Sequence, residues 1–448
     1  MKRLTKEQKY ILLGIFLFAI FLLILLETPE HYESYKFDLS SLGDSSKNNS
    51  KNGFKETMIL DFENGKSTKE DLKNNFTTKS FSGVNDGSIC GDSSWSSKLA
   101  EFDPTCGNVR YKNEFENSES NLISVNNNKL VLKIGEPKND DSEILNFLKD
   151  QKDSGNNVFP SIRLTSKNTF KNNQQHLFIL KAKLPFGKAL WPAWWLTGTT
   201  DGKQESLNTD WPRNGEIDII ELVNEEKNFK NVLHMCNKCK SRWKKGPKYG
   251  QSETKWGKTT ECQGEYGGGC FSGEDYNGET VKANGNLFSL DDPSGIFACW
   301  WKPGIKEETI DDKKVKILGE IRFYYWKHDD QNLNSNTGPL SNNPNPNEWD
   351  NDMMTAVQYW KGEGKENVES CTNQDDEKDC HFNNMKMIFN TTVCGDWAGN
   401  TFPEGEQENK YPNCLKYITS SEGSAEIQKQ KWEISYIAAF SKDLDNSN

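Results

Sequence analysis

The sequence predicts an all-β sandwich, and three observations carry this prediction. Short segments that alternate apolar and polar residues recur along most of the 448 residues. Clusters of Gly, Asn, Pro and Asp separate them, as expected for turns between strands. Little helical periodicity is visible, so sheet packed on sheet is favoured over a helical architecture. The segments expected to form strands are residues 58–62, 130–134, 161–164, 176–183, 215–223, 321–326, 385–389 and 432–440.

An apolar run without a charge occupies residues 10–26, preceded by Lys and Arg and followed by Glu27 and Glu30. Its length is at the short limit for a membrane span, and no clear cleavage site follows it. We therefore expect a cytoplasmic N-terminus at residues 1–9 and one transmembrane helix at 10–26 that serves as an uncleaved signal anchor. A cleaved signal peptide, which would make the protein secreted, is the alternative.

The remainder divides into a stem and one domain. Residues 27–55 are rich in Ser, Asn, Lys and Glu, which is typical of a flexible stem. Residues 56–442 are expected to form the folded domain. Loop insertions are expected at residues 139–157, with room for a short surface helix, and at 236–270 and 332–347.

The eleven cysteines all lie beyond the apolar run, where an oxidising compartment makes disulfides the default. Their odd number leaves at least one unpaired or intermolecular. N-x-S/T sequons at Asn48, Asn75 and Asn390 agree with a glycoprotein in this compartment. An alternative for one group of cysteines is a zinc site. That group is Cys236, Cys239, Cys262 and Cys270.

The formal net charge of −11 argues against nucleic acid or an anionic membrane surface as a partner, because both select basic patches.

The most informative stretch is Gly215-Glu-Ile-Asp-Ile-Ile-Glu221. Strand alternation puts Glu216 and Asp218 on one face and Glu221 on the other, but a one-residue β-bulge would return Glu221 to the first face. Three acids on one face repel one another, so folding alone does not favour them. Glycosidic bond cleavage needs such acids, one as a nucleophile and one as a proton donor. The alternative, a strand of simply solvated acids, is disfavoured because the intervening isoleucines require burial.

Flanking motifs occur in a fixed order: Leu190-Trp-Pro-Ala-Trp-Trp-Leu-Thr-Gly198, Trp211-Pro-Arg-Asn-Gly215, Leu233-His234, and Ile388-Phe-Asn-Thr-Thr-Val-Cys-Gly-Asp-Trp-Ala-Gly399. Together with the acidic strand, from about residue 159 to 440, they resemble glycoside hydrolase family 16, particularly fungal-type, laminarinase-like endo-1,3(4)-β-glucanases. The resemblance implies a concanavalin A-like jelly-roll β-sandwich with a concave glycan-binding cleft. It implies no required cofactor; a structural calcium ion is common in the family, but its ligands are not evident in this sequence.

The resemblance also assigns the acids. Glu216 matches the nucleophile, Glu221 the general acid/base, and Asp218 the assisting carboxylate that tunes the nucleophile. Adjacent acids push each other's pKa values apart, which agrees with separate roles. The six-residue form with a bulge resembles the 1,3-β-glucanase branch. The pair Asp396-Trp397, in the last motif, is expected to be structural.

The candidates for substrate binding are Trp191, Trp195, Trp211, His234 and Arg163. Trp191 and Trp195 lie four apart on a presumed strand, so they share a face and would offer stacking surfaces to sugar rings, whereas Trp194 would face the core. Pro192 is awkward in a central strand, so a strand is expected to begin or end near it. Core aromatics, a structural histidine and a salt-bridged framework arginine are the alternatives.

These observations favour a retaining endo-glycosidase that hydrolyses 1,3-β or mixed 1,3/1,4-β-glucan, with its catalytic domain outside the cytoplasm. A single-pass type II membrane protein would meet its polysaccharide partner there while held by the N-terminal helix. A cell-wall transglycosylase would use the same glycosyl-enzyme intermediate, and the anchor favours it more than free secretion would. A non-catalytic β-glucan-binding protein is the third alternative, although it would ordinarily have lost Glu216 or Glu221.

Overall fold

The structure is a computed structural model, and the chain divides into two compact units, Met1–Lys47 and Asn48–Asn448. The residues that it describes all belong to the second unit: 52–78, 109–111, 115, 121–137, 159–199, 215–226, 229–235, 239–247, 256–261, 271–272, 275–276, 279–280, 293–328, 330, 333, 335–360, 382 and 384–444. None of the helices within these ranges is long and apolar enough to cross a membrane. The apolar run at residues 10–26 and the insertion at 139–157 lie outside them.

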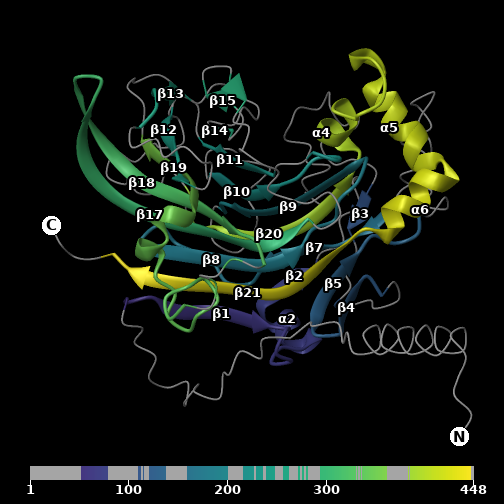
Figure 1. Cartoon of the computed structure of the whole chain (residues 1–448), viewed down its shortest axis with the longest axis horizontal. Coiled ribbons are helices and arrows are strands. Elements are labelled where there is room, and N and C mark those ends of the chain that lie inside the picture. Colours follow the sequence, from purple (N-terminus) through teal and green to yellow (C-terminus); the bar gives the residue numbers. More distant parts are fainter. Residues whose placement is uncertain are drawn as a thin grey trace, which may run out of the picture. The chain divides into compact units, whose positions relative to one another are not determined.

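Two antiparallel sheets stack face to face, which confirms the predicted all-β sandwich (Figure 1). The larger sheet has the order β13-β12-β19-β18-β17-β8-β21-β5-β4, and β1 also pairs with β21. Its strands are β1 (Lys55–Asp61), β4 (Ile123–Asn126), β5 (Lys129–Lys133), β8 (Gln174–Lys183), β12 (Lys240–Lys245), β13 (Thr260–Glu261), β17 (Ser294–Ile310), β18 (Lys313–Trp326), β19 (Met353–Trp360) and β21 (Lys431–Asp443).

The smaller sheet has the order β14-β11-β10-β9-β20-β7-β2. Its strands are β2 (Phe76–Thr78), β7 (Arg163–Ser166), β9 (Leu190–Thr197), β10 (Glu216–Glu221), β11 (Lys230–His234), β14 (Phe271–Ser272) and β20 (Lys386–Val393). Two short pairs stand apart from both sheets: β3 (Val109–Tyr111) with β6 (Phe159–Ser161), and β15 (Asp275–Tyr276) with β16 (Glu279–Thr280).

The main core lies between the two sheets. Alternate residues of the smaller sheet, such as Trp194, Ile217 and Phe389, belong to one apolar cluster with Phe178 and Phe323 of the larger sheet. Because successive side chains of a strand point to opposite faces, the residues between them project away from the core. The smaller sheet therefore has one face that is not committed to packing, and the acids of β10 lie there.

Every segment expected to be a strand contains one, but the sequence missed several others. The insertion at residues 236–270 was interpreted as a loop, and this was wrong for β12, whose Trp243 packs into the core. Its lysines alternate with core-facing residues, so the stretch reads as polar. Within the expected loop at 332–347, Leu333 and residues 335–347 are described. Leu333, Trp349 and Met353 join an apolar cluster on the outer face of the larger sheet.

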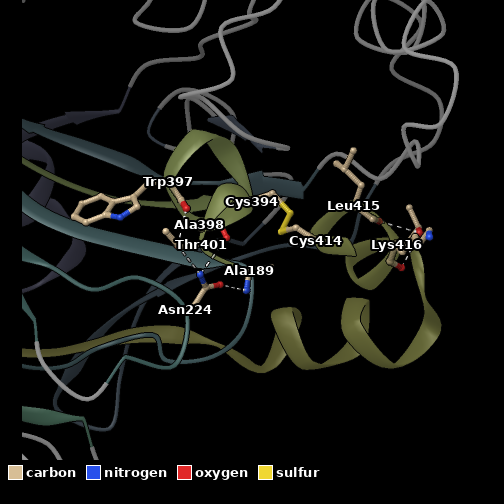
Figure 2. Close-up of a disulfide and its surroundings, with 10 residues drawn as sticks. Ala189, Asn224, Cys394, Trp397, Ala398, Thr401, Cys414, Leu415 and Lys416 are labelled. Carbon is tan, nitrogen blue, oxygen red and sulfur yellow. Dashed lines mark hydrogen bonds between the residues drawn. A yellow bond between two sulfur atoms is a disulfide. The ribbon is translucent and has the colours of Figure 1, made fainter. Parts of the chain in front are cut away.

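Helices between β20 and β21 were also missed. They are α4 (Gly395–Asn400), α5 (Lys410–Thr419) and α6 (Ser421–Lys429), which Figure 1 places at one end of the sandwich. The Cys394–Cys414 disulfide joins α4 to α5 across 20 residues (Figure 2). A few buried side chains, including Ile418 and Ile427, pack this region against Leu190. The remaining elements are α2 (Lys69–Asn75) and the 3₁₀ helices η5 (Pro346–Glu348), η6 (Asp350–Asp352) and η7 (Gln407–Asn409).

Candidate active site

The acidic strand β10 contains the predicted bulge. Against β9, Asp218 pairs with Trp195 and Ile220 with Trp194, so Ile219 is an extra residue in β10. Against β11, the register likewise shifts between Asp218 and Glu221. Residues that pair directly across antiparallel strands project to the same face, and the bulge therefore returns Glu221 to the face of the other acids.

Two local interactions fit β10 to this irregular path. The side-chain amide of Asn231 donates a hydrogen bond of 2.6 Å to the carbonyl oxygen of Ile219, the bulged residue. Gly215, just before Glu216, has a φ of +82°, and a Cβ there would lie only 2.8 Å from the backbone nitrogen of Phe382. A glycine is therefore required where the chain enters the acidic strand.

Neighbouring strands extend the same surface, which we call the acid face. The registers align Ala193 of β9 with Asn390 of β20, Asn390 with Arg163 of β7, and Glu216 with His234 of β11. The residues of the acid face used below are Arg163, Trp191, Trp195, Glu216, Asp218, Glu221, Lys230, His234 and Asn390. The sheet thus brings together four of the five predicted substrate-binding residues and all three acids, while Trp211 lies outside the described residues.

Glu216, Asp218 and His234 form a compact group. His234 Nε2 lies 3.5 Å from Asp218 Oδ2 and 3.8 Å from Glu216 Oε1. Asp218 is only 2% exposed, and burial raises its pKa well above the ordinary value, with further contributions from the charges of Glu221 and Glu216. Burial lowers the pKa of His234 to about 4, so its imidazole is neutral at pH 7. The hydrogen bond between Asp218 and Glu216 also raises the pKa of Asp218, so these contacts favour its protonated form.

Among the described residues, this group also offers two oxygens and one nitrogen within 4.8 Å of one another, as a metal ion would require. A metal ion would need the ionised carboxylate of Asp218, which burial disfavours, so the donors fit a carboxylate pair better than a metal centre. The zinc alternative for the cysteine cluster fails at Cys239, which is disulfide-bonded and supplies no thiolate. The other three cysteines of that cluster lie outside the described residues.

Glu221 has a different environment. It is 6% exposed, and its Oε1 accepts a hydrogen bond of 3.0 Å from the indole nitrogen of Trp191. In the adjacent strand β11, Glu221 pairs with Lys230, which was not among the residues predicted from the sequence. Trp397 of α4 packs edge-on against Trp191 at 5.3 Å between ring centroids. Its place in the last motif was the available signal for Trp397, whereas no signal pointed to Lys230.

Trp194 faces the core, as predicted. It is fully buried and stacks on Phe389. Trp195 projects to the acid face but is 8% exposed. The guanidinium of Arg163 lies 5.1 Å from the ring centroid of Trp195. The indole nitrogen of Trp195 donates a 2.7 Å hydrogen bond to Oδ1 of Asn390. Sugar stacking by Trp191 and Trp195 stays a prediction.

Asn390 was interpreted as a glycosylation sequon. It lies in the middle of β20, where its Oδ1 accepts a hydrogen bond from Trp195 and its Nδ2 donates one to Thr392, and its glycosylation stays a prediction. It is also part of the acid face.

Pro192 is the third residue of β9, so a strand begins near it, as expected. It pairs with Thr391 of β20, and its carbonyl accepts a hydrogen bond from Leu222, just beyond the end of β10. The ring nitrogen of Pro192 faces the same side as that carbonyl. The hydrogen-bond ladder with β10 has ended there, so the strand needs no N–H donor at this position.

The chain is similar in sequence to known glycoside hydrolases. A family model described as the XgeA-like, catalytic GH16 domain matches residues 97–308 and 318–440. A probable glycosidase of Schizosaccharomyces pombe is 27% identical over 306 residues, which cover 67% of this chain and 55% of that protein. An endo-1,3(4)-beta-glucanase of Arthroderma benhamiae is 25% identical over 358 residues, covering 75% and 60%. The chain thus spans little more than half the length of these relatives.

The solved structure of Laminarinase 16A from Phanerochaete chrysosporium, with β-glucans in its donor and acceptor sites, has a similar fold. The TM-score is 0.50 at 18% identity, and the match covers 86% of this chain and 99% of that one.

Proposed function

Because the chain belongs to glycoside hydrolase family 16, we propose that it is a retaining endo-glycosidase that hydrolyses 1,3-β-glucan or mixed 1,3/1,4-β-glucan. The observation that carries this proposal is the bulge in β10, which brings Glu216 and Glu221 to one face. The substrate class follows the name of the relative from Arthroderma benhamiae, an endo-1,3(4)-beta-glucanase.

In the first step the carboxylate of Glu216 attacks the anomeric carbon of the bound glucan. The bond from that carbon to the leaving oxygen breaks as Glu221 passes its proton to the oxygen. Burial favours the protonated form of Asp218, and in that form it donates a hydrogen bond to Glu216 that stabilises the negative charge on the nucleophile. The neutral His234 beside them adds no competing positive charge.

In the second step the carboxylate of Glu221 accepts a proton from a water molecule whose oxygen attacks the same carbon. The ester bond to Glu216 breaks, and two successive inversions give net retention at the anomeric carbon. A sugar hydroxyl in place of that water would give a longer glucan, so hydrolysis and transglycosylation differ only in the acceptor.

The acid face would hold the polysaccharide. Arg163, Asn390 and His234 provide hydrogen-bonding groups on strands to either side of the acids, as sugar hydroxyls require. Aromatic rings from β9 lie between these polar groups.

We also propose that this domain works outside the cytoplasm. The Cys394–Cys414 disulfide and the disulfide-bonded Cys239 support an oxidising compartment. The apolar run at residues 10–26 supplies the expected route to that compartment.

The test uses the purified full-length chain with laminarin, lichenan and cellulose, beside the variants Glu216→Gln and Glu221→Gln. Reducing ends, product sizes and the anomeric NMR signal of the first product are followed. Retained-configuration fragments of laminarin or lichenan from the parent, absent with Glu216→Gln, are expected. Products longer than the starting oligosaccharide would identify a transglycosylase, and binding without turnover would overturn the catalytic assignment.

A further inference from the structure

Trp397 contacts both side chains that flank Glu221 across the sheet. On one side, its ring packs edge-on against Trp191, with an interplanar angle of 80°. On the other side, the ammonium of Lys230 lies 4.4 Å from its ring centroid. Trp191 donates to Glu221 from β9, and Lys230 is the direct neighbour of Glu221 in β11. A single indole from outside the sheet therefore holds both neighbours of this carboxylate.

Each of these neighbours favours the charged form of Glu221. The hydrogen bond from Trp191 ends on a carboxylate oxygen, and Lys230 contributes a positive charge although it is 6% exposed. Lys230 also forms an ion pair of 3.2 Å with Glu226, which lies in the loop after β10 and partly neutralises its charge. On the same strand as Glu221, both Glu216 and, when it is ionised, Asp218 act in the opposite direction.

Hydrogen bonds to the backbone of α4 fix the position of Trp397 (Figure 2). Asn224 accepts a hydrogen bond from the backbone nitrogen of Ala189 and donates to the carbonyl oxygen of Ala398 and to Thr401. The Thr401 hydroxyl in turn donates a hydrogen bond of 2.7 Å to the carbonyl oxygen of Trp397. Asn224 lies three residues after Glu221, so the chain that leaves the acidic strand is tied directly to α4.

The disulfide completes this arrangement. Cys394 immediately precedes α4 and is bonded to Cys414 of α5. The two helices also pack closely, because a Cβ at Gly399 would lie 2.3 Å from the ring of Tyr411. A helix of six residues has little stability of its own, so these attachments determine where Trp397 lies.

We propose that Trp397 is a positioning residue for Glu221, which it holds in geometry and charge state through Trp191 and Lys230. The inference rests on the proposed function, in which Glu221 is the acid/base. It assigns to the helical segment at residues 395–429 a part in catalysis in addition to its place in the fold.

The test compares Trp397→Ala and Trp397→Phe with the parent in the full-length chain. Trp256→Ala is the matched control, because Trp256 is also partly buried and lies against two cations, Arg242 and Lys244, but far from the acids beside the larger sheet. The pKa of Glu221 is measured directly by NMR titration of glutamate labelled with ¹³C at the carboxyl carbon, with Glu221→Gln to assign the signal. This readout does not depend on turnover.

We expect Trp397→Ala to raise the pKa of Glu221 by about one unit, because a donor and a positive charge are loosened together. Trp397→Phe keeps a ring and should shift it less. At a pH below the alkaline limb, the kcat/KM for laminarin should fall about ten-fold, since Glu221 is no longer held in place to pass its proton to the leaving oxygen. The kcat/KM for a dinitrophenyl β-glucan oligosaccharide should stay within two-fold, because that leaving group departs without a proton.

An unchanged pKa of Glu221 in Trp397→Ala would overturn the proposal. Equal losses for both substrates would also overturn it, since they would indicate a general structural defect. If the parent cleaves neither substrate, the proposed function fails, while the titration still decides whether Trp397 controls Glu221. A folded Trp397→Phe variant, checked by its melting temperature, covers the case in which the alanine variant does not fold.

Discussion

The indole nitrogen of Trp191 donates a hydrogen bond of 3.0 Å to Oε1 of Glu221. The two residues come from adjacent strands, β9 and β10, and meet because the bulge at Ile219 turns Glu221 to the face of Trp191. Spacing alone suggested that Trp191 offers a flat surface to a sugar. The contact gives it a second task, since the indole also orients a carboxylate.

Replacement of Trp191 by phenylalanine keeps an aromatic ring and removes the donor. A hydrogen bond to a charged group contributes about 1.5–3 kcal/mol. Loss of the bond should therefore raise the pKa of Glu221 by about 1–2 units, at 1.36 kcal/mol per unit. The alkaline limb of the kcat/KM profile on laminarin should move to higher pH by the same amount.

The matched control is Trp432→Phe, which removes an indole donor from a buried tryptophan whose partner is the hydroxyl of Thr391. The alkaline limb should not move in this variant. If Trp191→Phe leaves the limb in place as well, the hydrogen bond has no bearing on the ionisation of Glu221.

The bulge could be predicted from sequence because three acids on one apolar strand make chemical sense only on a common face. The identity of the fold followed from alternation and from motif order. The contact between Trp191 and Glu221 could not be predicted, because spacing gives the face of a side chain and not the atom it reaches. Helices α4 and α5 were missed because they are held by Asn224 and the Cys394–Cys414 disulfide, and α6 because it packs through Ile427; all of these are tertiary interactions.

Asp218 gives a prediction about stability, because burial and two neighbouring acids raise its pKa in the folded state. The folded chain then holds a proton that the unfolded chain releases near pH 3.9. The stability contribution of this group is fully present below that pH and is lost as pH rises through the raised pKa. Asp218→Asn, which is neutral at every pH, should therefore raise the melting temperature at pH 7 relative to the parent.

The difference in melting temperature should disappear as the pH approaches 4. Asp312→Asn, at an exposed turn between β17 and β18, is the control and should behave like the parent throughout. A melting temperature that Asp218→Asn lowers at pH 7 would contradict a raised pKa of Asp218 in the folded state.

His176 should make the domain sensitive to mild acid. Burial lowers its pKa from 6.5 to about 4, while its ring nitrogens contact the carbonyl oxygen of Lys171 and the hydroxyl of Ser441. In the unfolded chain it binds a proton near pH 6.5, so its contribution is present above that pH and is lost as pH falls toward 4. The shift corresponds to about 3 kcal/mol in the free energy of unfolding.

Urea unfolding at pH 7 and at pH 4.5 measures this loss. In His176→Gln the fall in unfolding free energy between the two conditions should be smaller than in the parent, whereas His328→Gln, at an exposed position, should leave the fall unchanged. Equal pH dependence in the parent and His176→Gln would assign the acid sensitivity to other groups.

Gly215→Ala tests how tightly the entrance of the acidic strand is determined. The residue has a φ of +82°, and the added Cβ would meet the backbone nitrogen of Phe382 at 2.8 Å. A left-handed conformation costs a non-glycine residue about 1–2 kcal/mol, and the backbone contact adds a displacement that no side-chain rotation relieves.

Gly65→Ala separates the two effects, because Gly65 has a φ of +66° with no atom within 4 Å of its Cβ position. Gly65→Ala should lose about 1–2 kcal/mol of unfolding free energy and keep its activity. Gly215→Ala should lose more stability and at least about ten-fold in kcat, because Glu216 is the next residue and shifts with it. Equal losses of stability with unchanged kcat would mean that the strand absorbs the displacement before it reaches Glu216.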